Sequence, residues 1–287
     1  SNTTGASNTA FGRAALDSNT TASDNTAMGH NALGANTTGA NNTALGSSAL
    51  DANTTADGNT AVGKDSLGAN TTGHSNTAIG KDSLKLNVDG DRNTGLGFGA
   101  LNVANSPNDN TMVGYFAGVS VTTGNSNTAV GSFALDANTT ASNNTAIGYQ
   151  SLSANTTAST NVAVGKRALA SNTTGTNNVA VGTDALENHT TGSDNIAIGK
   201  NVANALTTGN TNIAIGGLAM NTNTVGDRNV AIGYSALETY NPASNDDSYN
   251  VAVGYAALEA NTTGKNNTAI GGNSTVSYTH LRAHETS

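Results

Sequence analysis

The chain has 287 residues, of which 4% are aromatic and 10% are charged, and it contains no Trp. So few large apolar side chains exclude an ordinary globular core, while the scarcity of charge and the regular recurrence of Val, Ile and Thr argue against a disordered polar tract. The net charge of -8, with no basic run, excludes the electrostatic surface that binds a phosphate backbone, so we expect no nucleic-acid partner.

The sequence also bears on the location of the protein. It has no apolar stretch of about 18 residues, so it predicts no membrane span in this chain. The absence of Cys suits an exposed, oxidising location. Because the chain opens at SNTTGAS, within a repeat and without an initiator Met, we expect it to be part of a longer protein.

A repeat of 17 residues runs along the chain. The repeats begin at Asn8 and recur every 17 residues as far as Asn229, and the last two begin at Asn250 and Asn267. Places within a repeat are numbered from this Asn. All sixteen repeats carry Gly at the fifth place and a β-branched residue at the second, and the fourth place is always apolar. The third place is nearly always Ala, and Leu recurs at the ninth.

Each repeat is predicted to form one short strand of about four or five residues that includes its second and fourth places. Residues two apart share one face of a strand, so the second and fourth places face the same way. We expect them to face inward over a small core, with Leu at the ninth place as a second apolar layer. A helix is disfavoured because Asn, β-branched residues and Gly would interrupt it before three turns had formed.

So short a strand cannot bury its face alone, so each repeat needs copies of itself stacked above and below it. The sequence therefore predicts an all-β fold over residues 1–273, a parallel β-solenoid with one 17-residue repeat per coil and about sixteen coils. Identical neighbours hold the strands in register. Gly at the fifth place is expected at positive φ or at a close approach of coils, and Asn at the first place in a hydrogen-bonded ladder.

The tripeptide Asn-Thr-Thr recurs at one place in the repeat and satisfies the N-glycosylation pattern. Its nine copies begin at Asn2, Asn19, Asn36, Asn53, Asn70, Asn138, Asn155, Asn172 and Asn261. Their fixed place favours a turn and ladder role over glycosylation, which also needs a competent host.

The same Thr files raise an alternative function, since ordered hydroxyls on a flat solenoid can bind ice. With Thr at the second place expected to point inward, only one outward Thr file remains, and this disfavours ice binding.

The sixth place, just past Gly, varies between basic and aromatic residues. We expect it to lie along one edge of the coils, where such side chains either bind carbohydrate or anionic surfaces or simply cover and solubilise the edge. The residues at this place that we take as a candidate binding surface are Tyr115, Tyr149, Lys166, Lys200, Tyr234 and Tyr255.

One repeat is longer than the rest. In the fourteenth, the spacing grows from 17 to 21 residues, and the added residues lie within 238–249. A solenoid tolerates an insertion only where the chain bulges outward, so we predict a protruding loop. Pro242 fits such a loop because it cannot donate to a strand ladder. We expect the loop to expose together, as a further candidate binding surface, Tyr240, Asp246, Asp247 and Tyr249.

Segments such as NTAIGYQSL, NVAVGKRAL and NTAVGKDSL resemble the head repeats of trimeric autotransporter adhesins, the YadA-like head family, whose shorter unit has the form SVAIGxxAxAxGxxN. Versions with NTTG also resemble repeats of tail-fibre-like proteins that end in a self-cleaving chaperone domain. The resemblance covers roughly residues 1–273. It implies a left-handed parallel β-roll, a homotrimer of chains side by side, and attachment from a cell or virion surface to a partner such as a host-surface glycan or matrix protein.

The sequence therefore predicts a structural and adhesive rod, extracellular or displayed on a cell or virion surface, in an adhesin or phage tail fibre. It contains no phosphate-binding Gly motif in a strand-to-helix context, no calcium-binding nonapeptide and no carboxylates marked as acid and base, so we expect no enzyme and no cofactor. Residues 274–287 depart from the repeat, and VSYTHLRAHETS resembles a translated sequencing-adapter read-through, so this tail is expected to be non-native. His280 and His284 lack a third ligand, and we expect no metal site there.

Overall fold

The computed structural model describes residues 2–245 and 247–275, so Asp246 and most of the predicted tail, with His280 and His284, lie outside the described residues. The chain falls into two compact units, Ser1–Asn161 and Val162–Ser287. All regular elements in the described residues are strands of three residues, one in each repeat. The all-β prediction is therefore confirmed. No described segment forms a helix long and apolar enough to cross a membrane.

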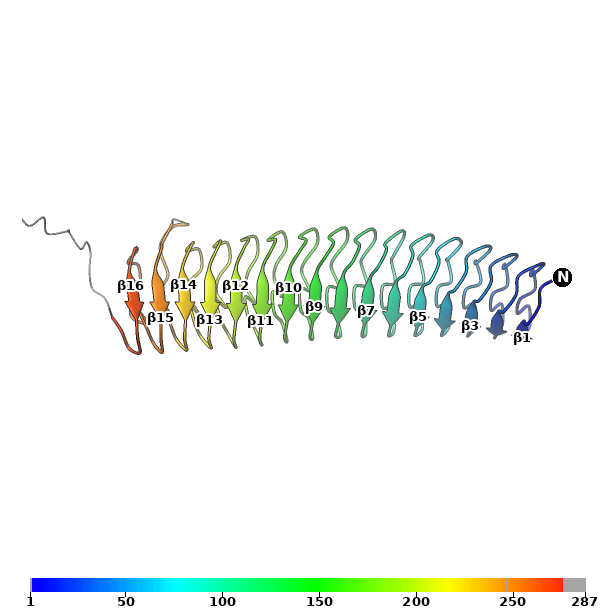
Figure 1. Ribbon diagram of the computed structural model, residues 1–287, viewed down its shortest axis with the longest axis horizontal. Helices are drawn as coiled ribbons and strands as arrows, with labels where there is room; N and C mark the ends of the chain where they lie inside the picture. The colour runs from blue at the N-terminus through cyan, green and yellow to red at the C-terminus, as the bar shows by residue number, and fades with distance from the viewer. Residues whose placement is uncertain (1, 246, 276–287) are drawn as a thin grey trace, which may run out of the picture. The chain divides into compact units, whose positions relative to one another are not determined.

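The first unit contains the strands of the first nine repeats. These are β1 (Thr9–Phe11), β2 (Thr26–Met28), β3 (Thr43–Leu45), β4 (Thr60–Val62), β5 (Thr77–Ile79), β6 (Thr94–Leu96), β7 (Thr111–Val113), β8 (Thr128–Val130) and β9 (Thr145–Ile147). Each strand pairs in parallel with the next along the chain (Figure 1), and equivalent places face each other, as Thr26 faces Thr43. The predicted register of a parallel solenoid is thus confirmed within this unit.

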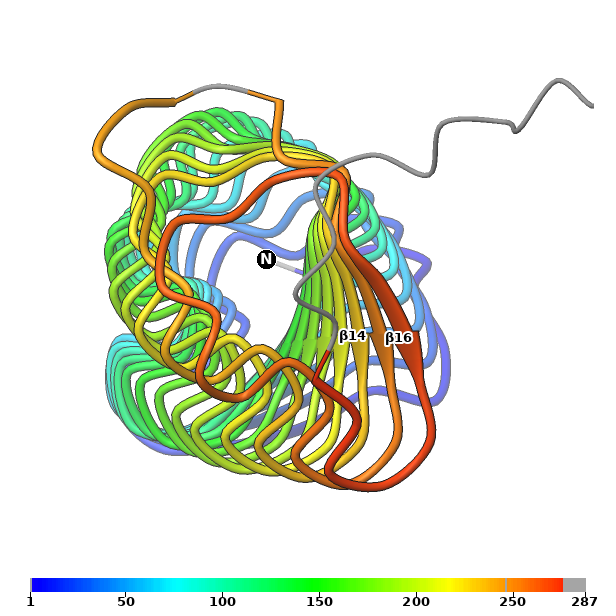
Figure 2. The same ribbon diagram turned by 90° about the vertical axis from the view of Figure 1, so that its left-hand side faces the viewer.

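The second unit repeats this arrangement with seven strands. These are β10 (Val162–Val164), β11 (Val179–Val181), β12 (Ile196–Ile198), β13 (Ile213–Ile215), β14 (Val230–Ile232), β15 (Val251–Val253) and β16 (Thr268–Ile270). They pair in parallel and in register, so that Ile196 faces Ile213. Seen end-on, each coil has its strand on one side and closes through turns on the other (Figure 2).

The strands face the opposite way from our expectation. The third place is buried in every strand from β2 to β16, as Ala146 shows, while Ile147 at the fourth place is 39% exposed. The reason is the narrow interior of the coil. A Cβ added at Gly95, which stands at the third place, would lie 2.5 Å from Ser83 Oγ and 3.1 Å from Leu84 Cδ1, so the space behind the strand admits only a very small side chain.

Leu at the ninth place forms the core, as predicted. Leu152, for example, is fully buried. One coil exchanges the two core places: Gly118 stands where Leu is usual, and Met112 stands where Ala is usual. A Cβ added at Gly118 would lie 2.5 Å from Met112 Sδ, so the long side chain of Met112 fills the volume that the missing Leu leaves.

Gly at the fifth place serves both predicted purposes. Its φ lies between 119° and 146° in all sixteen repeats, a region that L side chains rarely adopt. The coils also approach closely there, because a Cβ added at Gly131 would lie 2.4 Å from the carbonyl oxygen of Gly148.

Three further places, the seventh, ninth and seventeenth, also have positive φ although they usually carry side chains, which the sequence reasoning missed. In the ninth repeat they are Gln150 (φ 54°), Leu152 (φ 50°) and Thr160 (φ 62°). Such a conformation costs roughly 1–2 kcal/mol for each residue. Hydrogen bonds between coils offset part of this cost, as when Leu135 N donates to Ser151 O at 3.0 Å.

Two files of buried Asn link successive coils, which confirms the predicted ladder. At the first place, Asn25 N donates to Asn8 Oδ1 (3.0 Å), and Asn25 Nδ2 donates to Gly39 O (2.9 Å). At the twelfth place, which is the Asn of Asn-Thr-Thr, Asn53 Nδ2 donates to Asn36 Oδ1 at 2.9 Å. Both Asn36 and Asn53 are fully buried. Folded coils therefore offer no acceptor for a glycan at these two positions.

Candidate interaction surfaces

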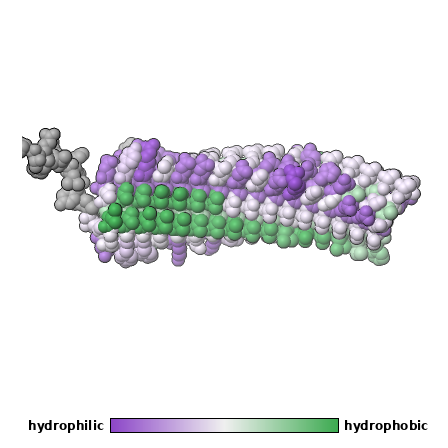
Figure 3. Space-filling model, viewed as in Figure 1, coloured by the Kyte–Doolittle hydropathy of each residue, from purple (hydrophilic) through white to green (hydrophobic). Residues whose placement is uncertain are grey.

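The outward strand face of the second unit carries two parallel files of apolar side chains (Figure 3). The second and fourth places are Val or Ile in every strand from β10 to β15. They are partly exposed, with Ile196 at 37%, Ile198 at 38% and Ile232 at 37%. A contiguous apolar patch of this kind usually marks a surface that binds another molecule.

The outward strand face of the first unit differs at the second place, which is Thr in every strand from β1 to β9. The fourth place is again apolar, and Phe11, Met28 and Leu45 are 73%, 43% and 44% exposed. Figure 3 accordingly shows a green row beside a pale one along these strands. Because this Thr file points outward, our expectation that it faces the core is wrong. The argument against ice binding, which assumed that only one Thr file faces outward, therefore no longer holds.

The sixth place forms an exposed edge beside the strand face, as predicted. Tyr115, Tyr149, Tyr234 and Tyr255 are 48%, 46%, 51% and 60% exposed, and Lys166 and Lys200 are exposed as well. Tyr234 and Tyr255 stack on each other, with ring centroids 5.9 Å apart and an interplanar angle of 10°. Tyr115 instead contacts the rings of neighbouring Phe residues.

An aromatic cluster that the sequence reasoning missed surrounds Tyr115. Phe98 stacks on Tyr115, with centroids 5.6 Å apart, and the rings of Phe116 and Phe133 meet Tyr115 edge to face at 4.5 and 5.4 Å. Gly99 leaves room for this cluster, because a Cβ there would lie 2.5 Å from the ring of Phe116. The seventh-place Phe residues next to the sixth-place column were the available signal. Because Phe98 stacks on the Tyr115 ring and two further rings meet it edge to face, the cluster stabilises this part of the edge.

The insertion loop protrudes from its coil, as predicted, and points away from the strands (Figure 2). Its base differs from our expectation, because Tyr240 is fully buried and Pro242 is buried as well. Tyr240 stands at the twelfth place, where most repeats have Asn, and its ring lies against Gly226. Tyr240 is therefore not part of an exposed binding surface.

The two other described candidates on this loop, Asp247 and Tyr249, are exposed. Arg228 forms an ion pair with Asp247, donates to Tyr249 Oη at 3.3 Å, and lies 5.7 Å from the centre of the Tyr249 ring. Tyr249 Oη donates to Asp247 Oδ2 at 2.8 Å. Asp247, Tyr249 and Arg228 thus form one exposed polar and aromatic group.

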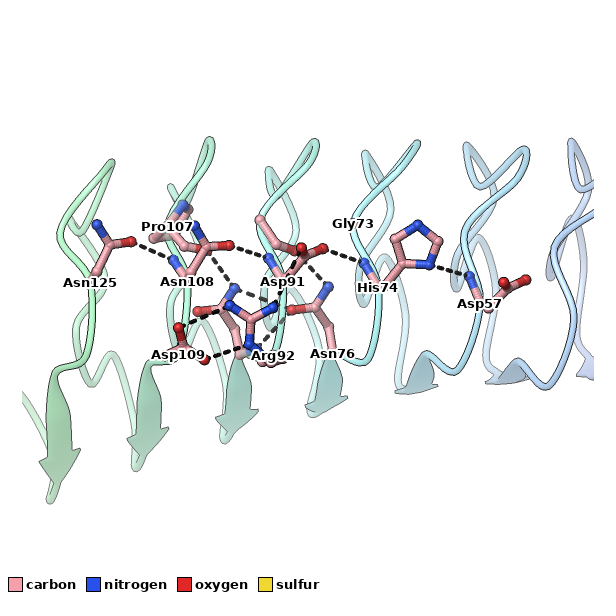
Figure 4. Close-up of polar contacts among 12 residues, drawn as sticks. Asp57, Gly73, His74, Asn76, Asp91, Arg92, Pro107, Asn108, Asp109 and Asn125 are labelled. Carbon is pink, nitrogen blue, oxygen red and sulfur yellow. Dashed lines mark hydrogen bonds and ion pairs between the residues drawn. The ribbon is translucent and has the colours of Figure 1, made fainter.

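A file of polar side chains at the sixteenth place joins coils of the first unit (Figure 4). Asp57 N donates to His74 Nδ1 (3.0 Å), His74 N donates to Asp91 Oδ1 (2.7 Å), and Asp91 N donates to Asn108 Oδ1 (2.8 Å). Each side chain accepts the backbone N–H of the coil before it. The file therefore satisfies backbone donors and has a structural role.

Carboxylates gather at two shallow hollows of the first unit. Asp17 and Asp51 line one, and Asp51, Asp65 and Lys85 line the other. Burial raises the pKa of Asp51. Lys85 pairs with Asp65 at 3.6 Å and with Asp82 at 3.0 Å, so this cation neutralises part of the acidic charge. No group of three or more metal-ligating side chains occurs in residues 2–245 or 247–275.

Comparison with known proteins adds no relative. No family model matches the chain, and no curated protein matches it. Its class therefore rests on the fold, a parallel β-solenoid repeat protein.

Proposed function

We propose that the chain is a structural and adhesive rod of a surface adhesin or phage tail fibre, acting outside the cell and without enzymatic activity. In this proposal three copies associate side by side through the outward strand faces. The observation that supports it is the double apolar file of β10 to β15, in which the second and fourth places hold no polar residue.

The energetics favour association over permanent exposure of this face. Fully burying one Val or Ile side chain contributes about 1.5–3 kcal/mol, and these side chains are about one third exposed in a single copy. Burying the part that is still exposed therefore adds only a fraction of this free energy per side chain, but two side chains in each coil contribute it. A second copy has the same spacing between coils, so its files match these along their length.

Attachment in this proposal uses exposed residues at the insertion loop. The exposed group of Asp247, Tyr249 and Arg228 lies beside the insertion loop, which points away from the strands (Figure 2). Tyr and charged side chains of this kind suit a host-surface glycan or a matrix protein. Glycan-array binding by the parent chain, lost on replacing Tyr249 by Ala, would support this part of the proposal.

Sedimentation equilibrium tests the association. The full chain should sediment as a trimer at micromolar concentration, and the double variant Ile198→Asp with Ile215→Asp should sediment as a monomer with an unchanged circular dichroism spectrum. A matched control places the same charges at the exposed fourteenth place, as Thr174→Asp with Thr191→Asp, and should remain a trimer. A parent chain that is monomeric across this range would contradict the proposal.

Ice binding is the second candidate, and the outward Thr file of β1 to β9 is the observation that favours it. Strands about 4.8 Å apart would space these hydroxyls regularly over the face. Thermal hysteresis measured on the purified chain separates the two candidates. We expect none, and a hysteresis that disappears when Thr77 and Thr94 are replaced by Leu would favour ice binding instead.

A further inference from the structure

We infer that neighbouring copies pair in parallel and in register, with Lys200 of one copy beside Asp194 of the next. This inference rests on the proposed association through the strand face and adds the orientation and the contact that fixes it. It comes from the charges on the two edges of that face.

Asp194 and Lys200 stand on opposite edges of the same strand. Asp194 is at the seventeenth place, two residues before Ile196, and Lys200 is at the sixth place, two residues after Ile198. Both side chains are exposed. In an assembly related by rotation about an axis parallel to the stack of coils, the leading edge of one copy meets the trailing edge of the next at the same height. The rotation therefore brings Asp194 of one copy level with Lys200 of its neighbour.

The two edges carry different charges. The sixth place holds Lys or Arg at five positions and no carboxylate, namely Arg13, Lys64, Lys81, Lys166 and Lys200. The seventeenth place holds three carboxylates, Asp24, Asp109 and Asp194, and two Arg, Arg92 and Arg228. Both of these Arg residues are paired with carboxylates of their own chain, Arg92 with Asp109 and Arg228 with Asp247. On the sixth-place edge, Lys64 and Lys81 are paired in the same way with Asp65 and Asp82, whereas Lys200 has no ion pair among the described residues.

This asymmetry selects the orientation. If two faces met in antiparallel fashion about a two-fold axis along the strands, each sixth-place edge would face another sixth-place edge, and Lys would approach Lys or Arg. Like charges across an interface disfavour a pairing, whereas opposite charges favour it and fix its register. Parallel pairing places the basic edge against the edge that carries Asp194.

Neither residue satisfies its charge within its own chain. Among the described residues, neither Asp194 nor Lys200 has an ion pair, and Asp194 Oδ1 only accepts a hydrogen bond from Asn177 Nδ2 at 3.1 Å. The strand keeps them apart on one chain. A second copy supplies the missing partner to each.

Charge reversal in the full chain tests the pairing. Lys200→Asp alone and Asp194→Lys alone should each weaken association at least about tenfold, since every interface of a trimer loses an attraction and gains a repulsion. The chain with both changes should recover to within about threefold of the parent. Lys166→Asp makes the same charge change on the same edge and should weaken association less than Lys200→Asp.

Carbodiimide cross-linking of a mixture of ¹⁴N- and ¹⁵N-labelled chains gives a second readout. We expect an amide between Lys200 of one isotope and Asp194 of the other. If the parent is a trimer but the double reversal stays as weak as the single ones, or if Lys200 cross-links only within its own chain, the pairing is wrong and the proposed function stands. A monomeric parent overturns both.

Discussion

Leu at the ninth place of most coils is buried in a left-handed backbone conformation, so replacing it should destabilise the coil strongly. We expect Leu152→Asp to destabilise its coil by more than about 3 kcal/mol, because it removes a core side chain and buries an unpaired carboxylate. Lys166→Ser, on the exposed edge, should change stability by less than about 0.5 kcal/mol. Thermal melting and hydrogen exchange of the affected coils measure both, and equal melting of Leu152→Asp and the parent would refute the core assignment.

The free energy of unfolding should depend on pH because of His189. It is fully buried at the twelfth place, where burial lowers its pKa although its Nε2–H donates to Gly192 O at 2.7 Å. A pKa below the ordinary value of about 6.5 means that the folded state takes up the proton less readily than the unfolded state. The stability contribution is therefore complete above pH 6.5 and is lost as the pH falls below that value and through the folded pKa.

The matched variant is His189→Asn, since Asn occupies the twelfth place in most repeats. It should donate to Gly192 O as Asn172 donates to Gly175 O at 2.9 Å. We expect the variant to melt above the parent at pH 5 and close to it at pH 8. The same pH dependence of melting in parent and variant would show that another group titrates.

Sequence reasoning at the residue scale identified the ninth-place Leu and the fifth-place Gly but reversed the strand. It assumed that β-branched and apolar residues at the second and fourth places, such as Thr145 and Ile147, must be the buried ones. In so narrow a coil the small residue between them is the buried one, and the constant Ala at the third place was the available signal. The larger side chains face outward, which accounts for an apolar file in a chain with so little core.

At the scale of the strand and its turn, Gly at the fifth place sets how closely coils stack. Gly131→Ala should cost more than about 1 kcal/mol, because its φ is 143° and the new Cβ would lie 2.4 Å from Gly148 O. Gly68→Ala is the control, since the nearest atom to its new Cβ is 3.3 Å away. Denaturant unfolding compares the two, and equal costs would contradict the close-approach account.

The insertion loop should be removable without loss of the fold. Deleting residues 243–246 restores the 17-residue spacing and keeps the buried Tyr240 and Pro242, so the melting temperature should change little. Deleting residues 241–244 restores the same spacing but removes Pro242, and it should destabilise the coil. If both deletions melt alike, the buried base of the loop does not stabilise the coil.

The register of the strands could be predicted because every repeat has equivalent residues at equivalent places. The loop base could not be predicted in the same way, because an insertion breaks that equivalence. With Asn229 as the first place, Tyr240 nevertheless stands at the twelfth place, which is usually a buried Asn. Its burial could therefore have been predicted by numbering the longer repeat from its start. The left-handed turns at Gln150, Leu152 and Thr160 were missed because these side chains do not usually favour positive φ. Asn or Asp at the seventh and seventeenth places of other repeats, such as Asn31 and Asp24, was the available signal for two of the three places.

For the whole molecule, the second place of the strands should decide how tightly copies associate. Replacing the six outward residues Val162, Val179, Ile196, Ile213, Val230 and Val251 by Thr gives the second unit the pattern that the first already has. The fold should persist, since Thr occupies this place in β1 to β9, and association should weaken by more than a hundredfold. Sedimentation measures the outcome, and unchanged association would place the interface elsewhere.

The hydrogen bonds between coils have a consequence for how the chain folds. In each unit they mostly join residues 14 to 18 apart, as Asn53 to Asn36 and Leu135 to Ser151, so these contacts close short loops of chain. Proteins whose contacts are short-range fold quickly, and stacked repeats can nucleate at any point and propagate from there. A coil can therefore be completed as soon as the next repeat is available.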